Sequence, residues 1–216
     1  MANLNAPFGL LPMEGAMGTA PNYQLTQANI AYNMTTPIYR GDLVERLVTG
    51  YIRQWQAGSS VAIIAGVFMG VEYLSTAQGK MVSNSYWPGS DVASTAQNTI
   101  VAKILPLGAG AQPMIFRVQS DATGVAFADI GANVEFTPGT GNALNGQSGG
   151  YISGIAQTAT LPLKIIGLYG GLPGAGGRMG IQAGSDGPYS GSATGAYAHA
   201  IVAANTVGTG TAGLTT

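Results

Sequence analysis

Residues 61–89 read VAIIAGVFMGVEYLSTAQGKMVSNSYWPG, and this stretch decides the fold. Its first part, Val61 to Tyr73, is the longest nearly unbroken apolar run in the chain. A polar turn over residues 75–79 follows, and the shorter run Lys80 to Trp87 closes with Pro88-Gly89. Val, Ile, Phe and Tyr favour strands, and Gly and Pro punctuate the ends, so the stretch predicts a buried β-hairpin. A run that is apolar on both faces predicts a central strand rather than an edge strand.

The regions on either side of this hairpin are also typical of short strands. Residues 42–55 hold two runs separated by Thr49-Gly50, which predicts a tight hairpin because Gly supplies a positive φ. Residues 99–105 and 113–119 predict a second strand pair joined by LGAGAQ. Further strands are expected within residues 133–136, 158–169 and 196–204, the last with a helix as the alternative. We therefore predict an all-β fold, a compact β-barrel or sandwich, with a β-tulip-like form as one variant.

The chain divides into an arm, one domain and a tail. Residues 1–25 predict an extended N-terminal arm, because Pro7, Pro12 and Pro21 block a helix and the apolar residues follow no regular period. Residues 26–206 predict a single β-rich domain. It contains a long Gly/Ser-rich loop at 170–195, and residues 207–216 form a low-complexity tail.

Composition excludes several classes of function. The net charge is −1 and only 8% of the 216 residues are charged, against roughly 25% in typical soluble domains. Nothing is basic enough to hold a phosphate backbone, so nucleic-acid binding is not expected. Cysteine is absent, which excludes a disulfide framework.

The longest apolar run is too short for a membrane helix, and the N-terminus lacks a signal-peptide pattern, so we expect synthesis in a cytoplasm and no membrane partner. Few charges and 34 glycines favour a surface covered by protein neighbours.

One stretch matches a catalytic motif. Residues 146–150, GQSGG, fit G-x-S-x-G around Ser148, and Asp186 and His199 follow in the order of an α/β-hydrolase triad. That fold places a buried strand before the serine and a helix after it, whereas here a Gly/Asn-rich stretch precedes Ser148 and a strand pattern follows. A Ser hydrolase therefore stands as a minor alternative, and we expect no catalytic residue, cofactor or metal site. His199 is the only histidine.

Four short motifs carry a family resemblance. They are ANLNAPFGL at residues 2–10, Gly41-Asp42 with Val44, AGVFMGVEY at 65–73 and SNSYWP at 83–88. In this order they resemble the capsid decoration (cement) proteins of tailed bacteriophages. Leu11 departs from the pattern, since an Arg is common at that place.

The resemblance implies a virion structural protein, made in the host cytoplasm, that binds the outer surface of the capsid. It implies β-rich protomers, grouped as homotrimers, that stabilise contacts between major capsid proteins; a tail or fibre component is the alternative. Such a protein stabilises a shell because it binds only the assembled state. The candidate contact residues are Phe8, Leu10, Leu11, Met13, Tyr86 and Trp87, with core packing as the alternative for Trp87. Deleting residues 2–13 is expected to weaken attachment and leave the β domain folded.

Overall fold

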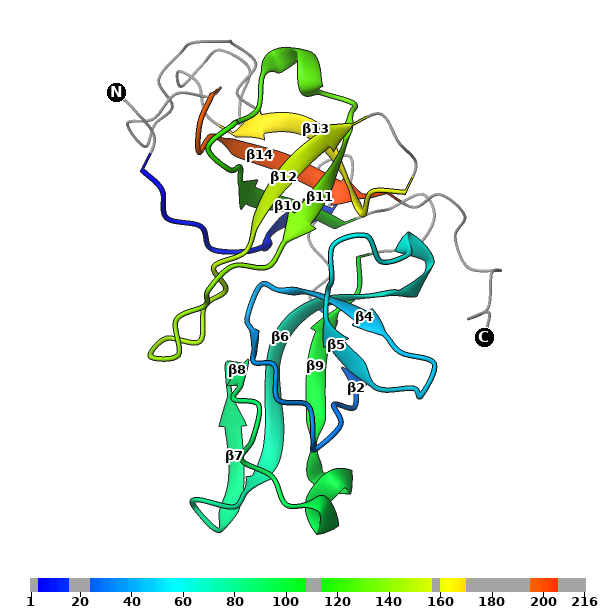
Figure 1. Ribbon diagram of the computed structural model, residues 1–216, viewed down its shortest axis with the longest axis vertical. Coiled ribbons are helices and arrows are strands. Elements are labelled where there is room, and N and C mark those ends of the chain that lie inside the picture. Colours follow the sequence, from blue (N-terminus) through cyan, green and yellow to red (C-terminus); the bar gives the residue numbers. More distant parts are fainter. Residues whose placement is uncertain (1–3, 16–23, 108–113, 157–159, 170–194, 206–216) are drawn as a thin grey trace.

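The computed structural model describes residues 4–15, 24–107, 114–156, 160–169 and 195–205, which form strands and short 3₁₀ helices (Figure 1). The strands are β1 (Leu11–Gly15), β2 (Thr26–Ala28), β3 (Ile38–Tyr39), β4 (Leu43–Arg46), β5 (Ile52–Gln54), β6 (Ile64–Ser75), β7 (Lys80–Asn84), β8 (Tyr86–Trp87), β9 (Val101–Leu105), β10 (Met114–Gln119), β11 (Asn133–Thr137), β12 (Tyr151–Ala156), β13 (Leu163–Tyr169) and β14 (His199–Ala204). The 3₁₀ helices are η2 (Val61–Ile63), η3 (Ser94–Thr99) and η4 (Phe127–Asp129). No helix in these ranges is long and apolar enough to cross a membrane.

Two antiparallel sheets make up most of the described protein. The upper sheet has the order β1-β10-β14-β13-β11-β12, and the lower sheet has the order β2-β9-β6-β4-β5 with β7 added to β6. A small ribbon of β3 and β8 lies beside the lower sheet. Neither sheet closes into a barrel over the described residues, although one bridge, Ser120 with Ile152, joins the end of β10 to β12. The all-β prediction is confirmed, in its sandwich form.

Strand β6 is the central strand of the lower sheet, as its apolar run predicts. It pairs with β9 along one side, and with β4 and then β7 along the other. Val67 faces one hydrophobic cluster and its neighbour Phe68 faces the other, so both faces are buried. The predicted hairpin is confirmed for β6 and β7, while the first residues of the run form η2 and β8 pairs with β3.

Most other predicted strands are present, but one predicted pairing is wrong. The hairpin of β4 and β5 turns at Gly50, whose φ is +86°, and residues 199–204 form a strand rather than a helix. Strands β9 and β10 do not pair with each other, because β9 belongs to the lower sheet and β10 to the upper sheet. The linker between them is longer than a tight hairpin turn, so its length does not require the two strands to pair. The loop predicted at 170–195 and the tail at 207–216 lie outside the described residues, except for Gly195.

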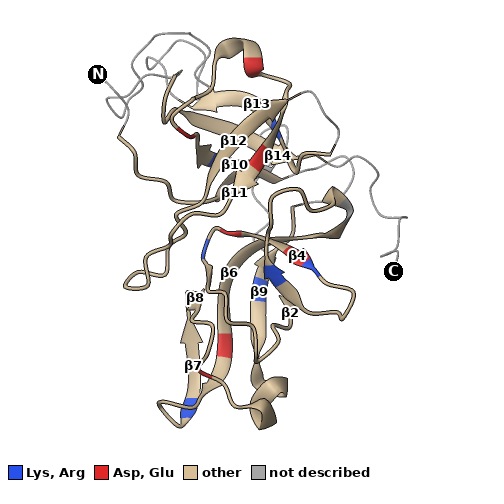
Figure 2. Ribbon diagram, viewed as in Figure 1, with Lys and Arg blue, Asp and Glu red and all other residues tan. Residues whose placement is uncertain are grey.

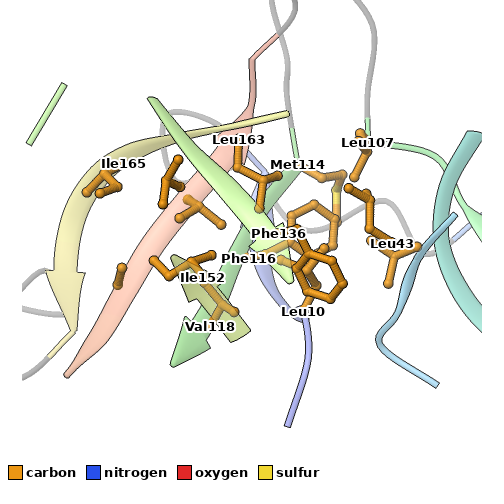
Figure 3. Packing of buried hydrophobic residues seen from close by; sticks show 14 of the residues in the cluster. Leu10, Leu43, Leu107, Met114, Phe116, Val118, Phe136, Ile152, Leu163 and Ile165 are labelled. Atoms are coloured by element: carbon orange, nitrogen blue, oxygen red, sulfur yellow. The ribbon is translucent and has the colours of Figure 1, made fainter. Parts of the chain in front are cut away.

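Two hydrophobic clusters form the core, one on each face of the lower sheet. The first lies where the sheets meet, and Figure 3 shows Leu10 and Leu43 close to Phe116 and Phe136 of the upper sheet. The second lies on the other face of the lower sheet and is covered by the β3–β8 ribbon and by η3, with Trp87 and Ala96 among its buried residues. Each large side chain buried in this way contributes about 1.5–3 kcal/mol relative to exposure.

Candidate contact site

The N-terminal segment, residues 4–15, is fastened to its own chain. Leu10 is only 2% exposed and belongs to the cluster between the sheets (Figure 3). Strand β1 then extends the upper sheet by pairing with β10. Leu10 therefore anchors the segment to its own chain and not to a partner, which corrects its assignment as a contact residue. Deleting residues 2–13 would remove this core side chain and most of an edge strand, so the structure predicts that the deletion also lowers the stability of the β domain.

The path of this segment depends on Gly9. Its φ is +75°, and a Cβ at this position would lie 2.6 Å from the carbonyl oxygen of Gly41 and 2.7 Å from Cβ of Ser148. The Gly9 N–H donates to the Gly150 carbonyl at 2.9 Å, and the Leu10 N–H donates to the Gly41 carbonyl at 2.8 Å. A side chain at position 9 would therefore meet both a steric clash and a disfavoured backbone conformation.

Phe8 packs against a cation and an imidazole. Its ring meets the His199 ring edge-on at 5.3 Å, and the Arg117 guanidinium lies 5.3 Å from the Phe8 centroid and 4.1 Å from that of Tyr169. Arg117 Nε donates to Nδ1 of His199 at 3.0 Å, so this nitrogen must be unprotonated. Burial, together with the Arg117 charge, lowers the pKa of His199 to about 4. We call Phe8, Arg117, Tyr169 and His199 the Phe8 clamp.

Gln119 fixes the first residues of the segment. Its Oε1 accepts from the Ala6 N–H at 2.9 Å, and its Nε2 donates to the Leu4 carbonyl at 2.7 Å and to the Tyr197 carbonyl at 3.1 Å. The Gln119 side chain is 1% exposed, so these bonds form largely away from water. Leu4 itself is 79% exposed, which leaves its side chain available at the surface while its backbone is held.

The remaining predicted contact residues of the segment lie nearer to solvent. Leu11 is 45% exposed and Met13 is half-buried. Both are in β1, which has a register shift between Pro12 and Glu14 and stands at the end of the upper sheet's strand order. An edge strand offers backbone groups as well as side chains to a neighbour.

Tyr86 and Trp87 are adjacent in β8 but have different environments. Trp87 is fully buried, donates from Nε1 to the Met34 carbonyl at 3.0 Å and meets the Tyr73 ring edge-on at 5.5 Å. Tyr86 is half-buried and stacks on Tyr39 at 5.4 Å. Trp87 therefore packs in the core, which is the alternative role given for it above. Of the two residues, only Tyr86 reaches the surface.

Ser148 of the G-x-S-x-G match belongs to a buried polar junction between the sheets. The residue is 2% exposed and its hydroxyl donates to Asp42 Oδ1 at 2.5 Å. Oδ2 of Asp42 accepts from the Tyr39 N–H and from Gln54, both at 2.8 Å. Burial raises the pKa of Asp42, and these hydrogen bonds oppose that rise. The Ser148 hydroxyl donates to Asp42 and accepts from the Gly150 N–H, and it is not bonded to His199. Asp186 lies outside the described residues.

The sequence reasoning missed a contact candidate in the 138–150 loop. Leu144 at its tip is 98% exposed, the highest value among the large apolar residues that the structure describes. Its backbone N–H donates to Oδ1 of Asn142 at 2.9 Å, and the Gln147 N–H donates to Oδ1 of Asn145 at 2.9 Å. Asn residues that bond their own backbone make a tight turn, and the N-x-L-N-G pattern was the available signal.

Charge is sparse over the described surface. Figure 2 shows few Lys, Arg, Asp and Glu residues, several of which lie close together around β4 and β9 of the lower sheet. Among the described residues no group of three or more His, Asp or Glu side chains could hold a metal ion. Large apolar side chains are exposed mostly in turns and loops, with only Leu11 and Met81 in strands of the sheets. The exposed residues are Leu4, Leu11, Leu25, Tyr32, Val48, Met81, Phe127, Ile130 and Leu144.

Comparison of the chain with family models, with curated proteins and with solved structures found no match. The family resemblance therefore rests on the four short sequence motifs alone. The structure explains only part of them: Gly9 and Leu10 of the first motif and Trp87 of the last have internal structural roles.

Proposed function

We propose that the chain is a virion structural protein that binds the outer surface of a phage capsid and stabilises contacts between major capsid proteins. The observation that carries this proposal is the set of exposed large apolar side chains on a charge-poor, all-β body. Apolar side chains that stay exposed on a folded surface mark sites of protein contact when they are extensive. Single exposed residues such as Val48 need no such explanation, but Leu144 stands on a loop held in place by several hydrogen bonds.

The placement of charge supports the same role. Lys103 pairs with Glu72 on neighbouring strands, and Arg53 pairs with Glu45, so each of these four charges has an opposite charge within the chain. A shell-binding protein of this kind would gain its affinity from apolar contacts and backbone edges, with little dependence on salt. Binding only to the assembled shell would then shift the equilibrium towards that shell.

Copy number in purified particles tests the proposal. We expect quantitative mass spectrometry of particles from the phage that encodes the chain to find it in numbers comparable to those of the major capsid protein. A few copies per particle would instead indicate a tail or fibre component, and absence from the particle would overturn both.

Particles that lack the chain should break at lower temperature, and adding the purified protein back should restore the wild-type temperature. Addition of a Leu144→Asp variant tests whether the exposed loop takes part.

A further inference from the structure

The 138–150 loop is a rigid projection and not a slack connection. Its base is bonded to the β3–β4 turn, because the Arg40 N–H donates to the Gly146 carbonyl and the Ser148 N–H donates to the Arg40 carbonyl, both at 2.9 Å. Its tip is closed by the Asn142 N–H donating to the Gln147 carbonyl at 2.8 Å. A Cβ on Gly141 would lie 2.2 Å from the Tyr39 ring, so the loop rests directly on that ring. Leu144 is therefore presented in a fixed place, and little conformational entropy is lost when it binds.

The same chain carries a groove on a different surface. It has a volume of about 690 Å³ and runs along β12 beside the turn that leads to η4. Val125, Ile152 and Ile155 give it an apolar lining, and Asp121 and Asp129 give it a polar one. Figure 1 places η4 at the far end of the upper sheet from the 138–150 loop. One copy therefore has room to offer its loop and its groove at the same time.

The polar groups of loop and groove are complementary. Asn142 and Asn145 use their side-chain oxygens within the loop, which leaves their NH₂ groups as donors. In the groove, Asp121 Oδ1 accepts from the Thr123 and Gly124 N–H groups, and Asp129 Oδ2 accepts from the Ala126 N–H. The other oxygen of each carboxylate has no hydrogen bond within the described part of the chain. The groove thus offers acceptors and an apolar wall, and the loop offers donors and a leucine.

We propose that the Leu144 loop of one copy docks into the β12 groove of a second copy. Residues 137–150 carry no charge, and the chain has a net charge of −1, so two copies meet without strong repulsion. The contact joins two different surfaces and is therefore head-to-tail, which closes into a ring or continues as a chain according to its rotation. This inference goes beyond capsid binding, and the protein alone suffices to test it.

Sedimentation velocity over a range of concentrations tests the contact. The average mass of the wild-type protein should rise above the 21.8 kDa of one chain as its concentration increases. Leu144→Asp should weaken the association at least about tenfold, as expected for an anchor residue. Ala126→Trp, which fills the groove at an exposed position, should do the same. Val48→Asp is the matched control: it places the same charge on an exposed apolar position of the β4–β5 turn and should associate like wild type.

Mixing the two defective variants gives the decisive result. Leu144→Asp keeps an intact groove and Ala126→Trp keeps an intact loop. In the mixture the loop of Ala126→Trp can therefore dock into the groove of Leu144→Asp, and the two variants should form a heterodimer. Wild-type protein that stays monomeric at every concentration would overturn the proposal. So would association of Leu144→Asp at wild-type strength, or a mixture in which both variants remain monomeric. Circular dichroism of each variant checks that the fold is intact.

Discussion

The N-terminal segment and the 138–150 loop are both irregular, glycine-containing stretches that carry leucine, yet they place that leucine in opposite environments. Leu10 is 2% exposed and Leu144 is 98% exposed. The Leu10 N–H donates to the Gly41 carbonyl in another part of the chain, whereas the Leu144 N–H donates to the Asn142 side chain two residues away. The two stretches therefore differ in where their backbone N–H groups find acceptors: in a distant part of the chain for the N-terminal segment, and within the loop itself for residues 138–150.

This difference has a simple physical basis. A backbone N–H removed from water must find a partner. The loop supplies partners locally through Asn142 and Asn145, so it keeps its shape without packing its apolar side chain. The N-terminal segment has no such local partners and takes them from Gln119, Gly41 and Gly150, which draws Leu10 into the core. Apolar residues in an irregular segment are thus poor evidence of a binding arm unless the segment can satisfy its own backbone.

The largest expected effect is that of removing Leu10 from the core. Leu10→Ala leaves a cavity between the sheets and should lower the free energy of unfolding by about 3 kcal/mol. Urea denaturation followed by tryptophan fluorescence measures this, because Trp55 lies in the same cluster. A loss below about 1 kcal/mol, the size of a surface effect, would mean that the segment is not packed as described. The comparison with Leu144 would then fail.

Local patterns predicted the lower sheet better than the upper one. The β6–β7 and β4–β5 hairpins join neighbours in sequence, so the apolar runs and the intervening turns specified both the strands and their pairing. In the upper sheet β1 pairs with β10, and β10 with β14, across long sequence separations. Alternation predicts such strands but carries no information about their partners. For this reason the position of β10 and the docking of β1 needed the structure.

The candidate contact residues likewise differ in how much of their role the sequence could predict. Tyr86 and Trp87 were recognised as aromatic, but only the structure shows which face of the two-residue strand is buried. Leu144 lies alone among Gly, Asn and Ala, so no periodicity could mark it. Its significance comes from the hydrogen-bonded turn that holds it out, which is a feature of geometry and not of composition.

A smaller effect is expected from acid, which acts on the Phe8 clamp. The pKa of His199 is about 4 in the folded protein, below its ordinary value of 6.5, because of burial and the Arg117 charge. The unfolded state therefore binds more protons between these values, and the stability contributed by neutral His199 is complete above about pH 6.5 and is lost as pH falls towards 4. We expect this loss to be smaller than that of Leu10→Ala, because the ring is partly exposed and its charge is screened.

The variant His199→Gln isolates this effect. Glutamine retains an oxygen that accepts from Arg117 but does not titrate. The difference in unfolding free energy between wild type and the variant should be constant above pH 6.5 and should fall between pH 6.5 and 4, since all other ionisable groups are the same in both proteins. A difference that stays constant through this range would show that His199 does not titrate there.

The smallest expected effect is that of Leu144→Ala on stability. The side chain makes no buried contact, so the free energy of unfolding should stay within about 0.5 kcal/mol of wild type, the range of surface substitutions. Urea denaturation of this variant beside Leu10→Ala compares the same substitution in the two stretches. Below the concentration at which copies associate, equal losses in the two variants would mean that the loop folds back on the body and buries Leu144. If Leu144→Ala leaves the free energy of unfolding unchanged but weakens self-association, the leucine contacts a partner copy. Its side chain then contributes to association and not to the stability of its own chain.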